Sequence, residues 1–384
     1  MTPSPSLNIP WSPSTVSVSV IETSSRIIAK TSVVVQPHII GHDEFNCPCY
    51  SFLIGHQATG EKILFDLGIR KDPENLSPRT YAFTKAMSIS SQVNVSDILG
   101  DEVFNISAII WSHHHFDHIG DPSTFPPSTA LVVGQGFKDE FLPGYPANQD
   151  SWIKESDYGG REFVELNFGE AGLKLGQYDA VDYFGDGSFY LLDCPGHTVA
   201  HIMGLARTTT DTFVLMAADC CHHGGELRPS PYQPLPESID LPVTAKGKLR
   251  PLRSPCPSSL FLRVHPKNSR TEAFYELNNP HNSDTVKEAM RSQRKLEEFD
   301  ASEDVLVLTT HDSDAADVID LYPKTINGWK SKGWKQRLHW AFLHDFQVER
   351  SWIVNNGSPS MGGDLANKLS TSVGQLYIDD SLPG

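Results

Sequence analysis

The sequence predicts a layered fold of β-sheets and helices, and three observations support this class. Short, almost wholly apolar segments recur, as in sheets that are covered on both faces; they are residues 106–112, 129–134, 188–193, 212–219 and 304–312. Polar residues with ligand-type side chains stand at or just after the ends of four of them. Two segments, 283–299 and 331–346, carry apolar residues at helical spacing. In layered folds, loops that follow strand ends commonly hold the functional site.

Other elements follow from local patterns. Residues 15–23 alternate between apolar and polar side chains, which is typical of a strand. Residues 26–37 indicate another strand. Residues 50–54 and 62–68 flank a turn-rich segment, so they predict an antiparallel hairpin. A short helix is expected over 95–101.

The chain of 384 residues is long enough for one large domain or two ordinary ones. Residues 1–14 contain four prolines and predict a disordered arm. We expect one domain over 15–350 and a C-terminal extension over 351–384. Within the domain, 224–282 is rich in proline and has no clear period, which indicates an inserted, lid-like segment.

Composition excludes several classes of function. The formal net charge of -16 disfavours a nucleic-acid partner and an anionic membrane surface. No apolar run is long enough to span a bilayer, and the N-terminus lacks a signal pattern, so we expect a cytoplasmic protein. A disulfide framework is not expected in a chain of this size; the six cysteines are Cys47, Cys49, Cys194, Cys220, Cys221 and Cys256.

The most informative stretch is "SHHHFDHIGD" at residues 112–121, which has the order H-x-H-x-D-H. His113 and His115 are two residues apart on a tight loop and can chelate one cation. Asp117 and His118 then point to a neighbouring position. Imidazole and carboxylate ligands suit zinc and similar first-row ions. Two-metal hydrolytic sites also need a bridging carboxylate.

Asp219 is the candidate bridge, and His197 and His311 can each complete one cation site. The alternative for the motif is a solvated, histidine-rich loop. We expect His114 to point away from the ligands and His201 to pack or to support a ligand. Cys221 is a less favoured ligand because both sites are already filled. The remaining histidines are interpreted as structural: His38, His42, His56, His265, His281, His339 and His344.

In order along the chain, these elements resemble the metallo-β-lactamase superfamily: Asp66 after a strand in "LFDLG", the H-x-H-x-D-H loop, the "GH" His197, Asp219 and His311. The resemblance runs from about residue 28 to about 315. It implies an α+β fold, a four-layer αββα sandwich with two metals in a cleft at one edge. "SHHHFDHIGD" and "CPGHTVAH" resemble the quorum-quenching N-acyl homoserine lactone lactonases most closely. Fungal members that open lactones, lactams or cyclic carbamates are a weaker resemblance.

The resemblance implies a division of the ligands between two Zn²⁺ ions, with other first-row divalent ions as alternatives. Metal one is bound by His113, His115 and His197; metal two is bound by Asp117, His118 and His311; Asp219 bridges. Asp66 is expected to orient a ligand imidazole.

The implied activity is a metal-dependent hydrolase that opens a small lactone or lactam. Water acidified by the two cations attacks the ring carbonyl, and Asp117 orients the water and passes its proton to the leaving group. One departure concerns the site: similar lactonases have a tyrosine three residues after the bridging aspartate, where this chain has His222. His222 is therefore a second catalytic candidate, since imidazole can also donate a hydrogen bond. Residues 224–282 are also longer than usual.

Three alternatives stay open at this point. A thioester hydrolase of the glyoxalase II type needs a basic patch near the C-terminus, for which "KSKGWKQR" at 330–337 is a candidate. Diiron redox or sulfur-dioxygenase chemistry uses the same fold. An interaction protein without metal is the third, although every ligand position is filled. The sequence does not predict the substrate, the resident metal or the oligomeric state.

Overall fold

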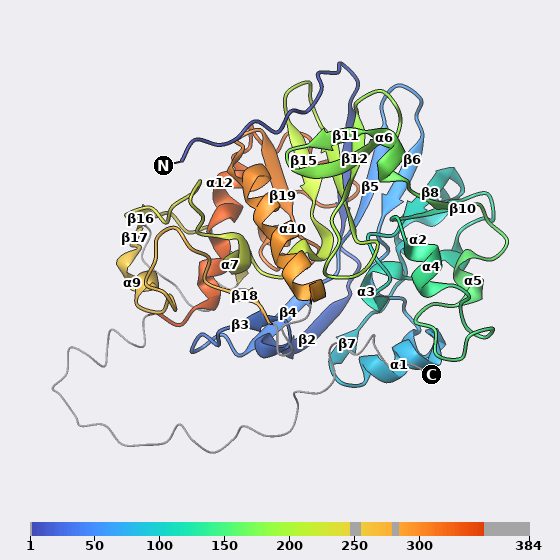
Figure 1. Ribbon diagram of the computed structural model, residues 1–384, viewed down its shortest axis with the longest axis horizontal. Coiled ribbons are helices and arrows are strands. Elements are labelled where there is room, and N and C mark those ends of the chain that lie inside the picture. Colours follow the sequence, from blue (N-terminus) through green and yellow to red (C-terminus); the bar gives the residue numbers. More distant parts are fainter. Residues whose placement is uncertain (1, 246–254, 279–283, 349–384) are drawn as a thin grey trace.

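The computed structural model describes residues 2–245, 255–278 and 284–348. Two six-stranded sheets lie face to face at the centre, and helices cover the outer face of each (Figure 1). The layer order is helix, sheet, sheet, helix. The four-layer αββα sandwich that the sequence predicts is therefore confirmed.

The first sheet has the order β1-β5-β6-β8-β9-β10. The pairs β1–β5 and β5–β6 are antiparallel, whereas the pairs from β6 onward are parallel. Its strands are β1 (Val16–Ile21), β5 (Ser51–His56), β6 (Lys62–Phe65), β8 (Ile106–Ile110), β9 (Ala130–Val133) and β10 (Phe163–Glu165).

The second sheet has the order β11-β12-β13-β14-β15-β19. All its pairs are antiparallel except β15–β19, which is parallel. Its strands are β11 (Leu173–Leu175), β12 (Tyr178–Asp182), β13 (Phe189–Asp193), β14 (Ile202–Arg207), β15 (Phe213–Met216) and β19 (Val305–Leu308).

Alternate residues of each strand enter different cores, because successive side chains point to opposite faces. On β6, Phe65 joins the core between the two sheets, while Leu64 joins the core under the helices of the first sheet. On β15, Val214 faces the first core, while Leu215 packs under the helices of the second sheet. Burial on both faces explains why these strands are almost wholly apolar.

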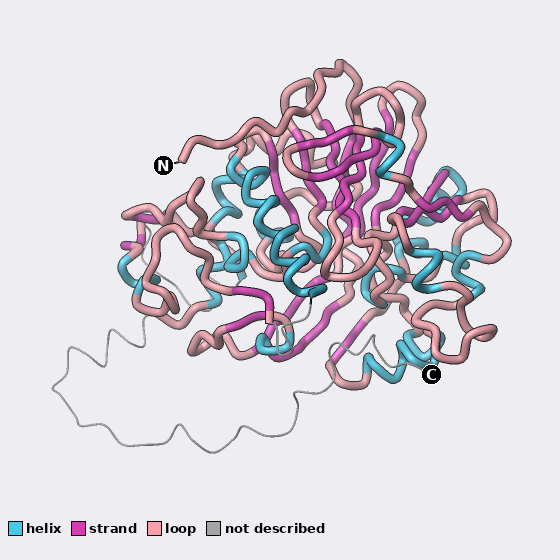
Figure 2. Tube along the Cα trace, in the orientation of Figure 1, coloured by secondary structure: helices cyan, strands magenta, loops and turns pink. Residues whose placement is uncertain are grey.

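The helices divide between the two outer layers (Figure 2). Over the first sheet lie α1 (Pro78–Thr84), α2 (Val95–Leu99), α3 (Phe116–Ile119), α4 (Phe137–Phe141) and α5 (Glu155–Tyr158). Over the second lie α7 (Gly224–Leu227) and α10 (Asp284–Ala301). The remaining described helices are α6 (Phe168–Ala171), α9 (Ser259–Leu262), α11 (Ala315–Val318) and α12 (Trp334–His339). The 3₁₀ turns are η1 (Thr31–Val33), η2 (Pro73–Asn75), η3 (Gly100–Asn105), η4 (Pro122–Thr124), η5 (Ala218–Cys220) and η6 (Ala341–Asp345).

The 224–282 segment, in its described part, packs as a layer of its own beside the sandwich. Leu235, Phe261 and Phe274 share one apolar cluster with Phe342 and Phe346 from the C-terminal part of the domain. Three small sheets lie outside the two large ones, and one of them, the pair β3–β18, joins this segment to the N-terminal region. Their strands are β2 (Arg26–Lys30), β4 (Glu44–Pro48) and β7 (Ser88–Ser90); β3 (Val35–Gln36) and β18 (Glu276–Leu277); and β16 (Ser238–Ile239) and β17 (Cys256–Pro257).

Some expectations differ from the structure. The single helix expected over 331–346 divides into α12 and η6, because Trp340 between them has a non-helical backbone (φ -113°, ψ 11°). The strand expected over 26–37 is interrupted by η1. The arm expected to be disordered packs instead: Gly176 N donates to Leu7 O, and Leu7 is buried.

The expected helix over 283–299 is confirmed as α10 from Asp284, whereas the C-terminal extension lies outside the described residues. Within the described ranges, no helix has both the length and the apolar character that crossing a bilayer requires.

Candidate metal centre

The predicted ligands come from four strand ends that meet at one edge of the sandwich. His113 follows β8, and His197 follows β13. Asp219 lies in η5 directly after β15, and His311 follows β19. His115 is the N-cap residue of α3. This short helix carries the remaining two ligands, Asp117 and His118.

The first group gathers three imidazoles and one carboxylate oxygen. His115 Nδ1 lies 2.9 Å from His113 Nε2 and 3.0 Å from His197 Nε2. Asp219 Oδ2 lies 3.8 Å from His113 Nε2 and 3.4 Å from His197 Nε2. These four ligand atoms all lie within 4.8 Å of one another. They are the atoms of the set expected for metal one.

The second group uses the other oxygen of the same aspartate. Asp219 Oδ1 lies 3.1 Å from His118 Nε2 and 3.2 Å from His311 Nε2. Asp117 Oδ2 lies 3.5 Å from His118 Nε2 and 3.4 Å from His311 Nε2. Asp219 therefore faces both groups, one oxygen to each, as a bridging carboxylate would.

Hydrogen bonds behind the ligands determine which ring nitrogens carry hydrogen. Asp66 accepts from Ser112 N (2.7 Å), Ser112 Oγ (2.8 Å) and His118 Nδ1 (2.8 Å). His311 Nδ1 donates to Pro48 O at 2.8 Å. In their neutral forms, which a metal ion requires, His118 and His311 therefore both present an Nε2 lone pair to Asp219.

The Ser112 hydroxyl extends this arrangement to the first group. Because its only hydrogen goes to Asp66, Ser112 Oγ accepts from His113 Nδ1 at 3.0 Å. His113 Nε2 is then also left with a lone pair directed at the group. The expectation that Asp66 orients a ligand imidazole matches this geometry, and Ser112 adds an orienting residue that the sequence did not indicate.

Two buried polar atoms without partners among the described residues show whether the second group can hold a cation. His118 Nε2 and Asp219 Oδ1 are buried, and in the described part of the chain neither has a hydrogen-bond partner. Two lone pairs 3.1 Å apart repel unless a positive charge lies between them. A divalent cation satisfies both atoms, and imidazole with carboxylate is a donor set that first-row ions accept. The residues present therefore fit metal ions.

The charges in the site also favour cations. Burial raises the pKa of Asp219, but the neighbouring His118 and His311 outweigh burial and hold that pKa well below its ordinary value. Burial lowers the pKa of His118, yet Asp219, Asp117 and Asp66 hold it well above the ordinary value. The carboxylates thus attract positive charge to this place, and a metal ion competes with a proton for it.

The histidines expected to lie outside the ligand set do so. His114 stacks on Phe141, with ring centroids 4.1 Å apart, and is buried away from the group. His201 Nε2 accepts from Asp219 N at 3.2 Å, and its Nδ1 donates to Cys194 O at 3.0 Å. His201 therefore supports the backbone of the bridging residue, as the expectation of a packed or supporting role requires.

His222 lies beside the centre. Its Nε2 is 3.5 Å from Asp219 Oδ2, and its Nδ1 is 3.9 Å from Glu226 Oε2. Burial lowers the pKa of His222, but Asp219 and Glu226 more than offset burial and raise it to about 10. Bound cations would lower this pKa again by neutralising Asp219. Sequence reasoning placed His222 near the cleft but missed Glu226.

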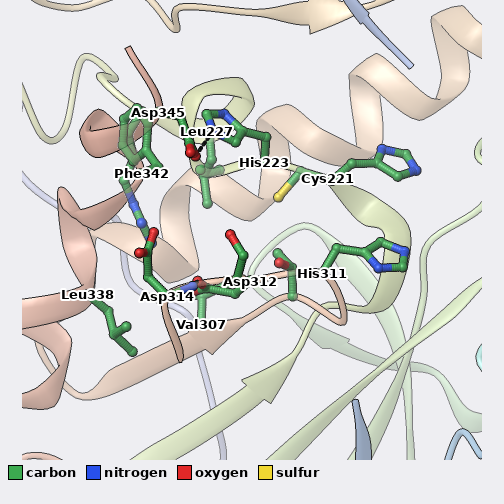
Figure 3. Close-up of a pocket in the computed structure, with 15 residues that line it drawn as sticks. Cys221, His223, Leu227, Val307, His311, Asp312, Asp314, Leu338, Phe342 and Asp345 are labelled. Carbon is green, nitrogen blue, oxygen red and sulfur yellow. Dashed lines mark hydrogen bonds and ion pairs between the residues drawn. The ribbon is translucent and has the colours of Figure 1, made fainter. Parts of the chain in front are cut away.

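A third cluster joins His42, His223 and Asp345, whose potential ligand atoms lie within 4.8 Å of one another. His223 Nδ1 accepts from Gly225 N at 3.0 Å, so its Nε2 carries the hydrogen and donates to Asp345 Oδ2 at 3.2 Å (Figure 3). His42 Nδ1 contacts Tyr275 Oη at 2.8 Å. Because His223 Nε2 is already a donor, this cluster is a hydrogen-bonded support for α7. No local pattern connects its members, which are far apart in sequence.

The αββα layers and the two ligand groups at their edge define a candidate metalloprotein, and comparisons with known proteins agree. The model of the metallo-beta-lactamase superfamily matches residues 45–214. Gamma-lactamase FDB1 of Fusarium pseudograminearum (strain CS3096) is 41% identical, over 92% of this chain and 88% of the relative. Metallo-hydrolase mfmC of Annulohypoxylon moriforme is 42% identical, over 90% and 91%. The chain therefore belongs to the metallo-beta-lactamase superfamily.

Among solved structures, a quorum-quenching N-acyl homoserine lactone hydrolase aligns with a TM-score of 0.50 over 82% of this chain and 100% of the other. Its sequence identity of 17% supports the shared fold alone. The two motifs on which the lactonase resemblance rests are short and lie at the centre, whereas the fungal relatives match across nearly the whole chain. Similarity to the fungal proteins is thus more extensive than the motifs indicated.

Proposed function

We propose that this protein is a metal-dependent hydrolase that opens the ring of a small lactone or lactam, with two divalent cations, zinc by preference. The observation that carries the proposal is the position of Asp219 between two ligand groups, with one carboxylate oxygen toward each. The names gamma-lactamase and metallo-hydrolase of two extensively similar relatives support the type of reaction.

The cations, when bound, would supply Lewis acidity toward the ring carbonyl and a water nucleophile that is reactive at neutral pH. The protein's own side chains would supply the groups that orient the water and transfer protons. Asp117 is 5% exposed and lies at the second ligand group, with Oδ2 3.4 Å from His311 Nε2. One of its oxygens can orient the attacking water and then carry the proton to the leaving oxygen or nitrogen.

His222 acts on the substrate in this proposal. Its ring reaches the centre, as the 3.5 Å distance between Nε2 and Asp219 Oδ2 indicates. There it can donate to the substrate carbonyl oxygen as negative charge develops, which is the role that a tyrosine would have at this position. The proposed substrate is a neutral or modestly polar lactone or lactam.

The glyoxalase II alternative needs free basic residues near the C-terminus, and the described contacts disfavour it. Lys330 pairs with Asp304, and Lys332 Nζ lies 2.5 Å from Asp320 Oδ2. Lys335 is buried and donates to main-chain oxygens, among them Asp300 O at 2.6 Å. The cations of residues 330–337 are thus largely engaged in local structure. A thioester substrate in the activity assay below tests this alternative directly.

The test is hydrolysis by the zinc-loaded protein of a panel that contains dihydrocoumarin, γ-butyrolactone, 2-pyrrolidinone and S-lactoylglutathione. We expect turnover of at least one cyclic ester or amide, lost in a chelator and restored by Zn²⁺. Turnover confined to the thioester, or turnover that survives complete metal removal, would contradict the proposal.

A further inference from the structure

We propose that His201 is a positioning residue that links the loop of His197 to Asp219, so that the ligands of the first group keep their spacing. The inference rests on the proposed function, because it concerns how the protein holds the cation of that group. It goes further than support of one backbone amide, since the same imidazole contacts three of the segments that carry ligands. Metal binding tests it without any substrate.

The first observation is that the two ring nitrogens of His201 bind different segments. Asp219 N donates to His201 Nε2 at 3.2 Å, and His201 Nδ1 donates to Cys194 O at 3.0 Å. A backbone N–H only donates and a carbonyl oxygen only accepts, so these partners fix the role of each nitrogen. The residue is 0% exposed, so solvent does not replace a lost hydrogen bond without a rearrangement. The imidazole thus connects the end of β13 with the turn after β15.

The second observation is that the same residue closes the base of the loop that carries His197. Cys194 N donates to His201 O at 2.9 Å. Cys194 and His201 are therefore joined by two hydrogen bonds, one through the main chain and one through the ring. Residues 195–200 form the loop between them, with His197 at its third position. The position of His197 therefore depends on the position of His201.

The third observation is that the ring of His201 lies beside two ligands of the first group. Its centroid is 5.2 Å from that of His113, at an interplanar angle of 45°, and 5.7 Å from that of His197, at 73°. One buried side chain therefore adjoins both imidazoles, in addition to its hydrogen bond with the bridging aspartate. A shift of this ring would change the distances among three of the four ligands of the group.

The backbone at both ends of the link has a conformation that alanine rarely adopts. Ala200, before His201, has φ +63°, and Ala218, before Asp219, has φ +44°. A side chain in this left-handed region is unfavourable, and such residues persist where the surrounding contacts hold them. Gly134 leaves space for the first turn, since a Cβ atom there would lie 2.1 Å from Ala200 O. The two side-chain hydrogen bonds of His201 are among the contacts that maintain these turns.

The test measures zinc affinity, by competition with a chromophoric chelator, in the wild type, His201→Asn, His201→Gln and His201→Leu. Asparagine can place its amide nitrogen near the position of Nδ1, and glutamine can place its oxygen near that of Nε2, so each keeps one end of the link. Leucine keeps neither end. A link fails when either end is lost, so we expect each variant to lower zinc affinity by about 10- to 100-fold. The leucine variant should lie within about threefold of the other two.

His265→Gln is the matched control, because His265 has the same kind of two-ended link to the main chain and belongs to neither ligand group. Its Nδ1 accepts from Lys267 N at 3.1 Å, its Nε2 donates to Glu272 O at 2.7 Å, and it is 4% exposed. We expect its zinc affinity to stay within about threefold of the wild type, although the free energy of unfolding falls. Equal losses of zinc affinity in His265→Gln and His201→Gln would overturn the inference, because general destabilisation then explains the loss.

A spectroscopic readout separates positioning from loss of folded protein. In the Co²⁺-loaded protein, the visible absorption depends on the coordination geometry. We expect a changed spectrum in all three His201 variants and the wild-type spectrum in His265→Gln. Wild-type affinity and spectrum in His201→Asn or His201→Gln, or a leucine variant whose loss equals the product of the other two, would overturn the inference. If these metal-binding results hold and no cyclic substrate is hydrolysed, the proposed function alone fails.

Discussion

His118 Nε2 lies 3.1 Å from Asp219 Oδ1, and both atoms are buried without a hydrogen-bond partner among the described residues. His118 Nδ1 donates a hydrogen bond to Asp66 at 2.8 Å. The ring therefore cannot turn away from Asp219 without losing this hydrogen bond. The fold thus holds a ring nitrogen and a carboxylate oxygen together at a place where a positive charge, a proton or a metal ion, stabilises them. This relationship connects the stability of the domain with metal binding.

Metal removal should destabilise the protein. Cations that bind only the folded state at about 1,000 times their Kd contribute about 4 kcal/mol to the free energy of unfolding. We expect the Tm to fall by roughly 6 °C in a chelator for each such cation lost, since an unfolding entropy of about 2 cal/mol/K per residue amounts to about 0.7 kcal/mol per °C for a domain of about 330 residues, and to recover with Zn²⁺. Asp219→Asn should show a smaller metal-dependent change in Tm than the wild type, because it loses at least one tightly bound ion. A wild-type Tm that does not respond to the chelator would exclude the coupling.

Asp117→Asn should reduce turnover more than it reduces metal bound by the first group. Asp117 lies outside the His113, His115 and His197 set, and the amide cannot accept and return a proton. We expect kcat to fall by about 100-fold or more, while at least one metal equivalent stays bound. Steady-state kinetics and elemental analysis on the same samples decide the matter. Turnover near that of the wild type would remove Asp117 from the chemistry.

Asp66→Asn should weaken the second group in particular. The amide presents one oxygen where the carboxylate offers two, so it loses either the contact with Ser112 or the contact with His118. Loss of such an orienting partner typically costs 10- to 100-fold in metal affinity. Competition with a chromophoric chelator should show one weakened site and one site near its original affinity. Two sites of unchanged affinity would show that Asp66 serves folding alone.

The strand ends were predictable from sequence because their signals are local. The runs before His113, His197 and His311 are almost wholly apolar, as is typical of strands buried on both faces. Ligand-type residues directly after them implied convergence at one edge, and the structure brings all of them to one place.

Other features depend on contacts between distant residues, which local patterns do not report. Glu226 meets His222 through the first turn of α7, and its carboxylate is fixed by Gln293 from a helix 67 positions away. The packing of Leu7 likewise arises from a tertiary contact, with Gly176, which overrides the local composition. The apolar cluster of residues 224–282 has no period of its own because its partners lie elsewhere in the chain.

The pair Arg228–Asp300 should be important for stability. Arg228 Nη2 lies 2.6 Å from Asp300 Oδ1, and both side chains are largely buried. Asp300→Asn leaves the guanidinium without its charge partner, so we expect a loss of about 3–5 kcal/mol in the free energy of unfolding. Chemical denaturation measures this loss, and a change below about 1 kcal/mol would show that the pair contributes little.

The same pair predicts a pH dependence. Burial raises the pKa of Asp300, but Arg228 outweighs burial and holds that pKa below its ordinary value. A carboxyl whose folded pKa is lowered contributes stability above its unfolded pKa of about 4 and loses that contribution as the pH falls toward the folded value. The difference in stability between the wild type and Asp300→Asn should therefore shrink below about pH 4. A difference that stays constant from pH 6 to pH 3 would contradict this assignment.

The central claim is that the chain binds two cations in the groups that share Asp219. Zinc titration of the metal-free protein, followed by elemental analysis of the loaded protein and of Asp219→Asn, tests it most directly. The account predicts about two equivalents per wild-type chain, and at most one tightly bound equivalent in the variant, because the variant loses the shared carboxylate. A wild-type protein that binds no zinc, or a variant that binds two ions as tightly as the wild type, would contradict it.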